Sequence, residues 1–208
     1  MKTNKELIDS MILSGVLKSP KIINAFEEID RKYFVPDDFL ENIYIDAPLP
    51  IGKNQTISQP TTVAFMLELL DAKEGDKVLD IGSGSGWTTA LLCNLVGKKG
   101  SVTGIERIEE LVRLGQQNLA QFNADNCRIK KAAAKLGVPD ETFDAILVSA
   151  SAEEIPEELF LQMNIGATLV IPVQNYIFKI KKISETKIKK ESYYGFVFVP
   201  LIYESQAF

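Results

Sequence analysis

Histidine is absent from all 208 residues of this chain. Histidine is the usual general base near neutral pH and the commonest metal ligand. Its absence excludes Ser-His-Asp triads, histidine metal sites and histidine general bases. Any chemistry performed by this protein must therefore depend on other side chains, and no metal site is expected.

Cysteine is nearly as scarce, with only Cys93 and Cys127 in the chain. Each lies in an otherwise apolar segment, and neither has a partner at the spacing of metal ligands. Two such residues do not form the dense disulfide framework of a small secreted protein. We therefore expect two buried, unreactive thiols in a reducing cytoplasm.

Long apolar runs are missing too. No stretch approaches the ~20 apolar residues that a membrane-spanning helix requires. The N-terminal sequence MKTNKELIDSMILSG also lacks the apolar centre of a signal peptide. The sequence therefore predicts a cytoplasmic protein without a membrane segment.

An excess of positive charge is also missing, because 28 acidic and 23 basic residues give a formal net charge of −5. Nucleic-acid binding favours a concentrated basic surface, so this balance argues against a nucleic-acid partner. Lysines do cluster at positions 181, 182, 187, 189 and 190. Their alternation with isoleucine favours a pair of strands with a solvated face over a phosphate-binding patch.

The remaining composition is that of an ordinary globular protein, with 46% hydrophobic and 25% charged residues. From position 77 onward, apolar segments of strand length alternate with segments of helical periodicity. This pattern predicts parallel strands joined by crossover helices, in a Rossmann-like, doubly wound, mostly parallel α/β sheet. The predicted strands are 77–81, 101–106, 127–131, 143–150 and 167–173, and the predicted helices are 85–96, 108–122 and one that begins near Pro156.

The segments on either side of this core have a different character. The first forty residues predict two helices, one with an apolar stripe from Leu7 to Val16 and one that begins at Pro20. Residues 44–58 contain prolines and a glycine and predict an extended loop, after which a helix is expected over 59–70. An Ile/Lys alternation at 177–183 and a final strand around 193–202 predict antiparallel strands at one edge of the sheet.

A glycine-rich loop follows the first strand of the core. The sequence VLDIGSGSGW holds Asp80 and, after it, Gly82, Ser83, Gly84 and Gly86. Glycine lets the backbone turn sharply and lets a ligand approach without a Cβ in the way. Open α/β sheets bind ligands at the carboxyl ends of their strands, where this loop is expected to lie. A tight turn in some other α/β protein is the alternative.

Two neighbouring features favour one class of ligand. The nicotinamide-cofactor pattern GxGxxG requires glycine at position 87, where this chain has Trp87, and the spacing GxGxG after Asp80 resembles motif I of S-adenosylmethionine (SAM)-dependent methyltransferases. SAM is cationic at its ammonium and sulfonium groups, which suits a nearby carboxylate. Glu106, 24 residues beyond Gly82, ends the second strand, where a carboxylate accepts hydrogen bonds from ribose hydroxyls. The alternative for Glu106 is a solvated acid at a strand end.

The residues upstream indicate a family. The run DAPLPIGKNQTISQPTTVAFM resembles the signature of the protein-L-isoaspartate O-methyltransferases, with matches at Asp46, 48–52, 55–60, Val63, Ala64 and Met66. The resemblance continues through DRKYFVP, GIERIEEL, FDAILVSASAEEIPEEL, LVIPV and FVFVPL, and so extends over nearly the whole chain.

This resemblance implies methyl transfer from SAM to the α-carboxyl group of L-isoaspartyl residues in damaged proteins, which begins their repair. It also implies one domain over 1–208, with N-terminal helices and a substrate-facing loop in 1–58, the SAM-binding core in 59–174 and C-terminal strands in 175–208. The implied catalytic residue is Ser58, and the implied substrate-binding residues are Thr56, Ile57 and Val199. The expected cofactor-binding residues are Asp80, Gly82, Ser83, Gly84, Gly86, Glu106, Arg107 and the residue at position 133, which is Ala133.

The lack of histidine is compatible with this chemistry. A carboxylate is ionised at neutral pH and is already a nucleophile, so it requires no strong base. The protein must mainly position the attacking oxygen and partly desolvate it, and the hydroxyl of Ser58 is suited to orienting it. The alternative for Ser58 is a helix N-cap ahead of Gln59 and Pro60.

Two segments depart from the family pattern. Asn54 replaces the glycine before QTISQP, although asparagine tolerates positive φ better than most residues. The family typically has Gly-Asp-Gly after the third strand, with its aspartate on the adenine amino group, where this chain has Ala132, Ala133 and Ala134. Losing that hydrogen bond costs about 0.5–3 kcal/mol of binding energy, and the alanines favour helix where a loop is expected.

Three hypotheses follow from these residues. The first is an isoaspartyl methyltransferase, and the second is a SAM methyltransferase that acts on another carboxylate or small molecule. The third is a degenerate relative that binds SAM weakly or not at all and serves as a binding module. Ser58, Asp80 and Glu106 favour the first two hypotheses, and Ala133 favours the third.

Overall fold

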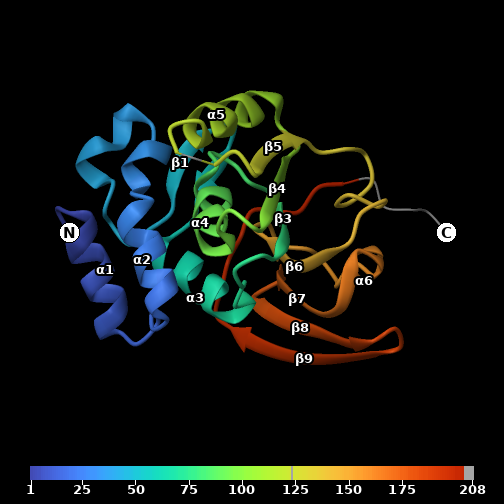
Figure 1. The fold of residues 1–208 in the computed structure, drawn as a ribbon. Helices are drawn as coiled ribbons and strands as arrows, with labels where there is room; N and C mark the ends of the chain where they lie inside the picture. The colour runs from blue at the N-terminus through green and yellow to red at the C-terminus, as the bar shows by residue number, and fades with distance from the viewer. Residues whose placement is uncertain (123, 204–208) are drawn as a thin grey trace.

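The computed structural model describes residues 1–122 and 124–203 (Figure 1). Within these ranges the core is a seven-stranded sheet in the order β5-β4-β3-β6-β7-β8-β9. Strands β3 to β7 are parallel to one another. Strand β8 pairs antiparallel with β7, and β9 pairs antiparallel with β8. The strands are β3 (Lys77–Ile81), β4 (Ser101–Glu106), β5 (Cys127–Lys131), β6 (Phe143–Val148), β7 (Met163–Val173), β8 (Tyr176–Ser184) and β9 (Lys187–Tyr194).

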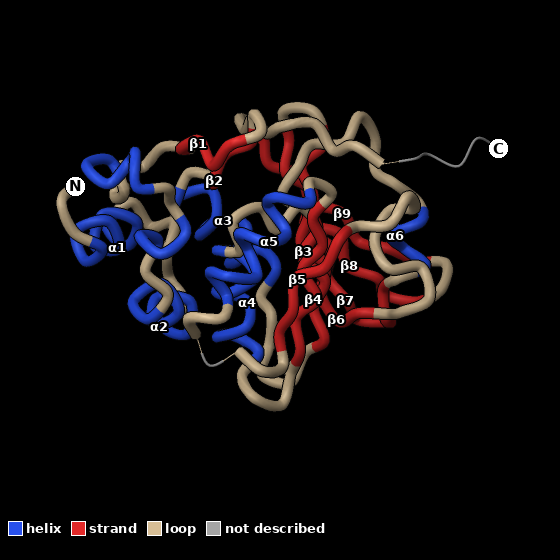
Figure 2. Tube along the Cα trace, turned by 90° about the horizontal axis from the view of Figure 1, so that it is seen from above, coloured by secondary structure: helices blue, strands red, loops and turns tan. Residues whose placement is uncertain are grey.

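Helices cover the two faces of the sheet unequally. Figure 2 shows helices α1 to α5 on one side of the strands and the short helix α6 on the other. The α-helices are α1 (Asn4–Leu13), α2 (Pro20–Glu28), α3 (Pro60–Leu70), α4 (Trp87–Val96), α5 (Glu109–Leu119) and α6 (Glu158–Leu161). Two 3-10 helices, η1 (Arg31–Phe34) and η2 (Asp37–Asn42), join α2 to a small hairpin of β1 (Leu49–Gly52) and β2 (Gln55–Ile57).

Alternating side chains along the strands build two cores. On β3, Val78 packs into the cluster that contains residues of α1 to α5, whereas Leu79 packs into the cluster around α6. Both side chains are fully buried. The central parallel strands β3 and β6 are covered on both faces and are buried over nearly their whole length, whereas the edge strand β5 is partly exposed.

The predicted fold class is confirmed, and several element boundaries agree with the sequence analysis. The strands predicted over 77–81, 101–106 and 127–131 have the observed bounds. Helix α4 begins at Trp87 instead of position 85, because the preceding residues form the glycine loop. The strand predicted over 143–150 ends at Val148, and that predicted over 167–173 already starts at Met163.

The final strand predicted around 193–202 is wrong. Strand β9 ends at Tyr194, and Gly195, with φ of 110°, leads the chain out of the sheet. The following segment crosses toward the carboxyl end of β6, where the N–H of Ser151 donates to the carbonyl of Val199 at 2.8 Å and the N–H of Leu201 donates to the carbonyl of Ser151 at 2.8 Å. The apolar pattern of this segment therefore reflects contacts with the site at that end of the sheet.

The extended loop predicted over 44–58 contains the β1–β2 hairpin. The two residues at its tip, Lys53 and Asn54, have φ values of 55° and 57°. A two-residue hairpin turn of type I′ requires positive φ at both central residues, and asparagine adopts this conformation readily. Asn54 therefore serves in the turn where the family pattern has glycine.

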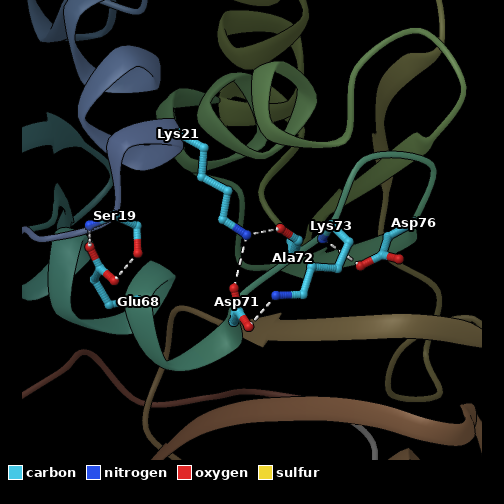
Figure 3. A network of polar contacts seen from close by, with 7 residues as sticks. All are labelled: Ser19, Lys21, Glu68, Asp71, Ala72, Lys73 and Asp76. Carbon is cyan, nitrogen blue, oxygen red and sulfur yellow. Dashed lines mark hydrogen bonds and ion pairs between the residues drawn. The ribbon is translucent and has the colours of Figure 1, made fainter.

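Polar contacts attach the N-terminal helices to the core (Figure 3). The carboxylate of Glu68 on α3 accepts hydrogen bonds from the N–H groups of Lys18 and Ser19, at 2.8 and 2.7 Å, and from the Ser19 hydroxyl at 2.6 Å. Lys21 of α2 donates to Asp71 and to the carbonyl of Ala72, both at 2.8 Å. These contacts fix α2 against the end of α3.

The expectation of two free thiols is wrong, because Cys93 and Cys127 form a disulfide. Cys93 lies on α4 and Cys127 begins β5, and their Cα atoms are 6.1 Å apart. The two residues are 34 positions apart in sequence, and only the packing of α4 over β4 and β5 brings them together. Sequence spacing alone does not reveal such a pairing.

No helix among residues 1–122 and 124–203 is long and apolar enough to cross a membrane.

The disulfide gives a test of the fold. Because it closes a loop between residues 34 positions apart, its reduction should lower the free energy of unfolding by about 2–4 kcal/mol. Urea unfolding followed by circular dichroism, with and without reductant, measures this difference. The double variant Cys93→Ser/Cys127→Ser is the control, and its midpoint should not respond to reductant. Equal wild-type midpoints in the two conditions would contradict the disulfide.

Candidate active site

The candidate site lies at the carboxyl ends of the central strands. After β3 the chain adds β4 and β5 on one side of that strand. It then returns and adds β6 and the later strands on the other side. Such a switch point opens a crevice between the loops that follow the strands. The glycine loop after β3 lies in this crevice, and its Gly82, Gly84 and Gly86 have φ values of 83°, 53° and 94°.

Close packing adds a second requirement for glycine at Gly86. A Cβ atom there would lie 3.0 Å from the carbonyl oxygen of Gly115 on α5 and 3.1 Å from a side-chain carbon of Ile129. Only glycine combines the positive φ with this close approach. The loop is therefore fixed against α5, and α4 begins immediately after it.

Asp80 supports the loop from inside the protein. Its side chain is completely buried, and its Oδ2 accepts hydrogen bonds from the hydroxyls of Thr88 and Thr89 at 2.9 and 2.6 Å. Burial raises the pKa of the Asp80 carboxyl group to about 6, while the two threonine hydrogen bonds oppose this shift and the nearby charge of Glu106 adds to it. A positive group near Asp80 would favour its charged form and lower this pKa.

Two buried oxygen atoms next to the crevice have no hydrogen-bond partner among residues 1–122 and 124–203. These atoms are Oδ1 of Asp80 and Oγ of Ser83. Buried polar atoms in folded proteins nearly always have a partner. The unpaired hydroxyl of Ser83 fits a ligand with hydrogen-bonding groups, and the buried carboxyl group of Asp80 behind it favours a ligand with a positive charge.

Glu106 lies where the sequence predicted, at the end of β4, and is 7% exposed. Its Oε2 accepts the N–H of Gly84 at 3.1 Å, and its Oε1 accepts the N–H of Ile108 at 2.9 Å. These bonds fix the carboxylate beside the glycine loop. Each oxygen retains further acceptor capacity, which suits it to ribose hydroxyls.

A first cavity of about 720 Å³, including its open mouth, extends from the glycine loop. Its lining brings together most of the residues predicted to bind the cofactor: Gly82, Gly84, Glu106, Arg107 and Ala133. The opposite wall comes from residues 199–203 and from Ile51, Gln55 and Thr56 of the hairpin.

The three alanines do not close this cavity. Residues 132–134 form an irregular loop after β5, so the helix that their composition favours is not formed. Ala132 and Ala133 line the cavity, and the N–H of Ala132 donates to the carbonyl of Glu106 at 2.9 Å. The space expected for the adenine is therefore open, although no aspartate lines it at this point.

A second, smaller chamber joins the glycine loop to the predicted catalytic serine. Its lining includes Ser58 and Ile57 on one side and Gly82, Ser83 and Thr88 on the other. Of the predicted cofactor-binding residues, Asp80 and Gly86 line neither this chamber nor the first cavity.

A third hollow lies on the outer side of Ser58. It is lined by Ser58, Thr56, Pro48, Gln59, Thr62, Ser149 and residues 195–199. Thr56 and Ser149 line all three spaces, which therefore form one continuous cleft. Val199, predicted to bind substrate, lines the first and the third.

The alternative role of Ser58 as a helix cap is wrong. The N-cap of α3 is Gln59, and the first N–H groups of the helix are served by Asp46, whose Oδ1 accepts the N–H of Thr61 at 2.9 Å. The other oxygen of Asp46 accepts the Thr61 hydroxyl at 2.7 Å and the Gln59 amide at 3.1 Å. Ser58 itself lines two of the three spaces of the cleft.

Sequence reasoning missed several residues of the cleft. Ser149 follows β6 and Thr88 lies in the first turn of α4. A signal existed for Ser149, because it comes directly after a buried strand of the parallel sheet, where ligand-binding loops lie. Among the described residues, 1–122 and 124–203, no cluster of acidic or cysteine side chains forms a metal site.

The sequence and the overall fold of this chain match those of known proteins. The family model described as protein-L-isoaspartate(D-aspartate) O-methyltransferase matches residues 2–206. The protein-L-isoaspartate O-methyltransferase of Pyrococcus horikoshii is 39% identical over 206 residues, which cover 96% of this chain and 93% of the relative. That of Fervidobacterium nodosum is 42% identical over 187 residues, which cover 88% and 94%.

A solved structure has the same fold over its full length. It is the crystal structure of a candidate protein-L-isoaspartate O-methyltransferase from Plasmodium falciparum in complex with S-adenosyl-L-homocysteine. The TM-score is 0.85 at 27% sequence identity, and the alignment covers 97% of this chain and 99% of that chain. With a family model that matches from residue 2 to residue 206, this chain belongs to the protein-L-isoaspartate(D-aspartate) O-methyltransferase family.

Proposed function

We propose that this chain transfers the methyl group of SAM to the α-carboxylate of L-isoaspartyl residues in damaged proteins and so begins their repair. The observation that carries this proposal is the continuous cleft in which Ser58 and the glycine loop line the same chamber. Family membership and the relatives named for this reaction support it. The expected partners are proteins and peptides that contain isoaspartyl residues.

The first cavity is the proposed binding site of the nucleoside. Glu106 and Arg107 line it near the end of β4, where the fixed carboxylate of Glu106 would accept the ribose hydroxyls. Ala133 lies at the place proposed for the adenine. The S-adenosyl-L-homocysteine in the Plasmodium falciparum structure supports a nucleoside site in this chain as well.

The glycine loop and Asp80 are proposed to hold the amino-acid part of the cofactor. The unpaired Oγ of Ser83 and the buried charge of Asp80 suit its ammonium group. When bound, SAM supplies a methyl group already activated by the positive sulfur. The chain must then bring a substrate oxygen into line with that carbon and exclude water.

Ser58 is proposed to orient the substrate carboxylate. The carboxylate is ionised at neutral pH, so one hydrogen bond from a hydroxyl is enough to aim an oxygen without removing a proton. Thr56 and Ile57 lie on the same loop and line the chamber. Val199 lines the third hollow, which is the proposed peptide groove. With the roles assigned in this way, no step of the proposed reaction requires a histidine.

Methyl transfer to an isoaspartyl peptide tests the function. We expect the purified protein to transfer labelled methyl from SAM to an isoaspartyl peptide and not to its normal aspartyl isomer. Ser58→Ala should lower kcat by about 10- to 150-fold, the value of a hydrogen bond to a charged group. Peptide labelling in a filter assay measures both effects.

The controls separate the hypotheses. Ser58→Ala should leave the affinity for S-adenosyl-L-homocysteine unchanged by calorimetry. Binding of this compound without labelling of either peptide would favour a methyltransferase for another carboxylate or small molecule. Failure to bind it would favour a non-catalytic binding module, and full activity of Ser58→Ala would refute the role of that hydroxyl.

Asp80 predicts a pH dependence of cofactor binding. Its carboxyl group, with a pKa of about 6 in the free protein, carries its charge above this pH and loses it below. A ligand ammonium prefers the charged form, so the dissociation constant for S-adenosyl-L-homocysteine should rise as the pH falls below 6, by up to about tenfold per unit. Titration calorimetry between about pH 5 and 8 measures this change.

Asp80→Asn is the matched control, because it removes the charge and keeps the shape. This variant should bind more weakly at about pH 7.5 and should show no rise in its dissociation constant below pH 6. A rise as steep as that of the wild type would assign the titration to another group.

Position 133 tests how the adenine is held. Ala133→Asp restores a hydrogen-bond acceptor at the cavity wall, so we expect tighter binding of S-adenosyl-L-homocysteine, by about two- to 150-fold. Ala134→Asp is the matched control, because Ala134 is exposed and does not line the cavity. Equal dissociation constants for wild type and Ala133→Asp would show that the base is held without this position.

A further inference from the structure

Arg31 is a fully buried arginine of the helix η1. Its guanidinium group donates to four backbone carbonyls that come from one loop. One nitrogen, Nη1, donates to Ile43 at 2.8 Å and to Ile45 at 3.1 Å. The other, Nη2, donates to Ala47 at 2.9 Å and to Ser58 at 3.1 Å. The loop that leads to Ser58 is therefore folded around this one side chain.

The guanidinium group also contacts Trp87, which lines the chamber next to the glycine loop. Its Cζ lies 5.5 Å from the centre of the Trp87 ring, in cation–π geometry. Trp87 is the first residue of α4, directly after Gly86, and its indole N–H donates to the carbonyl of Ile29 at 3.2 Å. Arg31 thus joins the loop that carries Ser58 to the helix that follows the glycine loop.

Arginine has the geometry that this position requires. The loop from Ile43 to Ser58 is largely irregular, and buried carbonyls need donors. A planar guanidinium supplies several donors in a fixed fork, whereas a lysine ammonium acts as a compact point charge. Burial lowers the pKa of Arg31 to about 10, so the group still carries its charge at neutral pH.

We propose that Arg31 is a positioning residue for methyl transfer, which holds the backbone of Ser58 at a fixed place relative to the glycine loop. This inference rests on the proposed role of Ser58 in orienting the substrate carboxylate. Arg31 itself lines none of the three spaces of the cleft. Its effect on the reaction is therefore transmitted through the loop that it binds.

A double-mutant cycle tests the inference. Arg31→Lys keeps the charge but loses the fork, and we expect kcat for the isoaspartyl peptide to fall by about 10- to 100-fold. In a Ser58→Ala background the same change should lower kcat by less than about threefold, because residues that act as a unit are not additive. The dissociation constant for S-adenosyl-L-homocysteine should change by less than about threefold in Arg31→Lys.

Lys182→Met is the control for general destabilisation, because it removes the hydrogen bonds that another buried basic side chain donates to backbone carbonyls. Lys182 on β8 is 7% exposed, and its Nζ donates to the carbonyls of Phe160 and Met163 at 3.3 and 3.0 Å, away from the cleft. This variant should lower the thermal midpoint and leave kcat at 25 °C unchanged. A loss of kcat in Lys182→Met as large as in Arg31→Lys would assign the effect to general destabilisation and overturn the inference.

The outcomes distinguish this inference from the proposed function. If the effects of Arg31→Lys and Ser58→Ala on kcat multiply, Arg31 does not act through Ser58 and the inference fails while the function stands. Full activity of Ser58→Ala overturns both residue roles. Absence of isoaspartyl methylation by the wild type overturns the function itself.

Tyr44 offers a milder variant if Arg31→Lys does not fold. Its hydroxyl donates to the carboxylate of Asp30, at 2.9 and 3.1 Å from the two oxygens, and so attaches the same loop to the residue before Arg31. Tyr44→Phe should lower kcat by about two- to fivefold, and by less in the Ser58→Ala background. Equal factors in the two backgrounds would overturn the inference.

Discussion

The contact between the glycine loop and helix α5 fixes the position of the reaction centre. Gly86 approaches Gly115 so closely that a single Cβ would lie 3.0 Å from a backbone oxygen, which a folded core does not accommodate without movement. With this end of the loop fixed, Gly84 meets the carboxylate of Glu106, and the unpaired oxygens of Asp80 and Ser83 lie next to the crevice. The hairpin also approaches this loop, because a side-chain carbon of Ile51 lies 3.2 Å from the place of a Cβ on Gly84.

Local sequence patterns were sufficient for the parallel core and its loops. Strand β3 and the glycine loop were predicted because buried strands and positive φ angles each demand particular residue types, and Glu106 lies at the end of β4 as expected. The segment after Tyr194 was misassigned as a strand, because apolar residues that face a cleft and those that face a sheet have the same pattern. The role of these residues depends on where the chain goes after Gly195.

Long-range pairings were beyond sequence reasoning for a related reason. The disulfide joins Cys93 to Cys127 only because α4 packs over the edge of the sheet, and the cap of α3 comes from Asp46 instead of the adjacent Ser58. Arg31 stands in the charged phrase DRKYFVP, and the structure buries it fully among the carbonyls of a loop. A charged residue gives no local sign of burial when its partners are backbone atoms distant in sequence.

Thr56 and Val199 each face both the nucleoside cavity and the peptide groove. The two proposed binding sites therefore share these two residues. If one ligand restricts the motion of their side chains, the other loses less conformational entropy when it binds. Thermodynamic linkage makes this influence symmetrical: whatever factor the nucleoside imposes on peptide affinity, the peptide imposes on nucleoside affinity. Any coupling between the proposed donor and peptide sites through Thr56 and Val199 would therefore act equally in both directions.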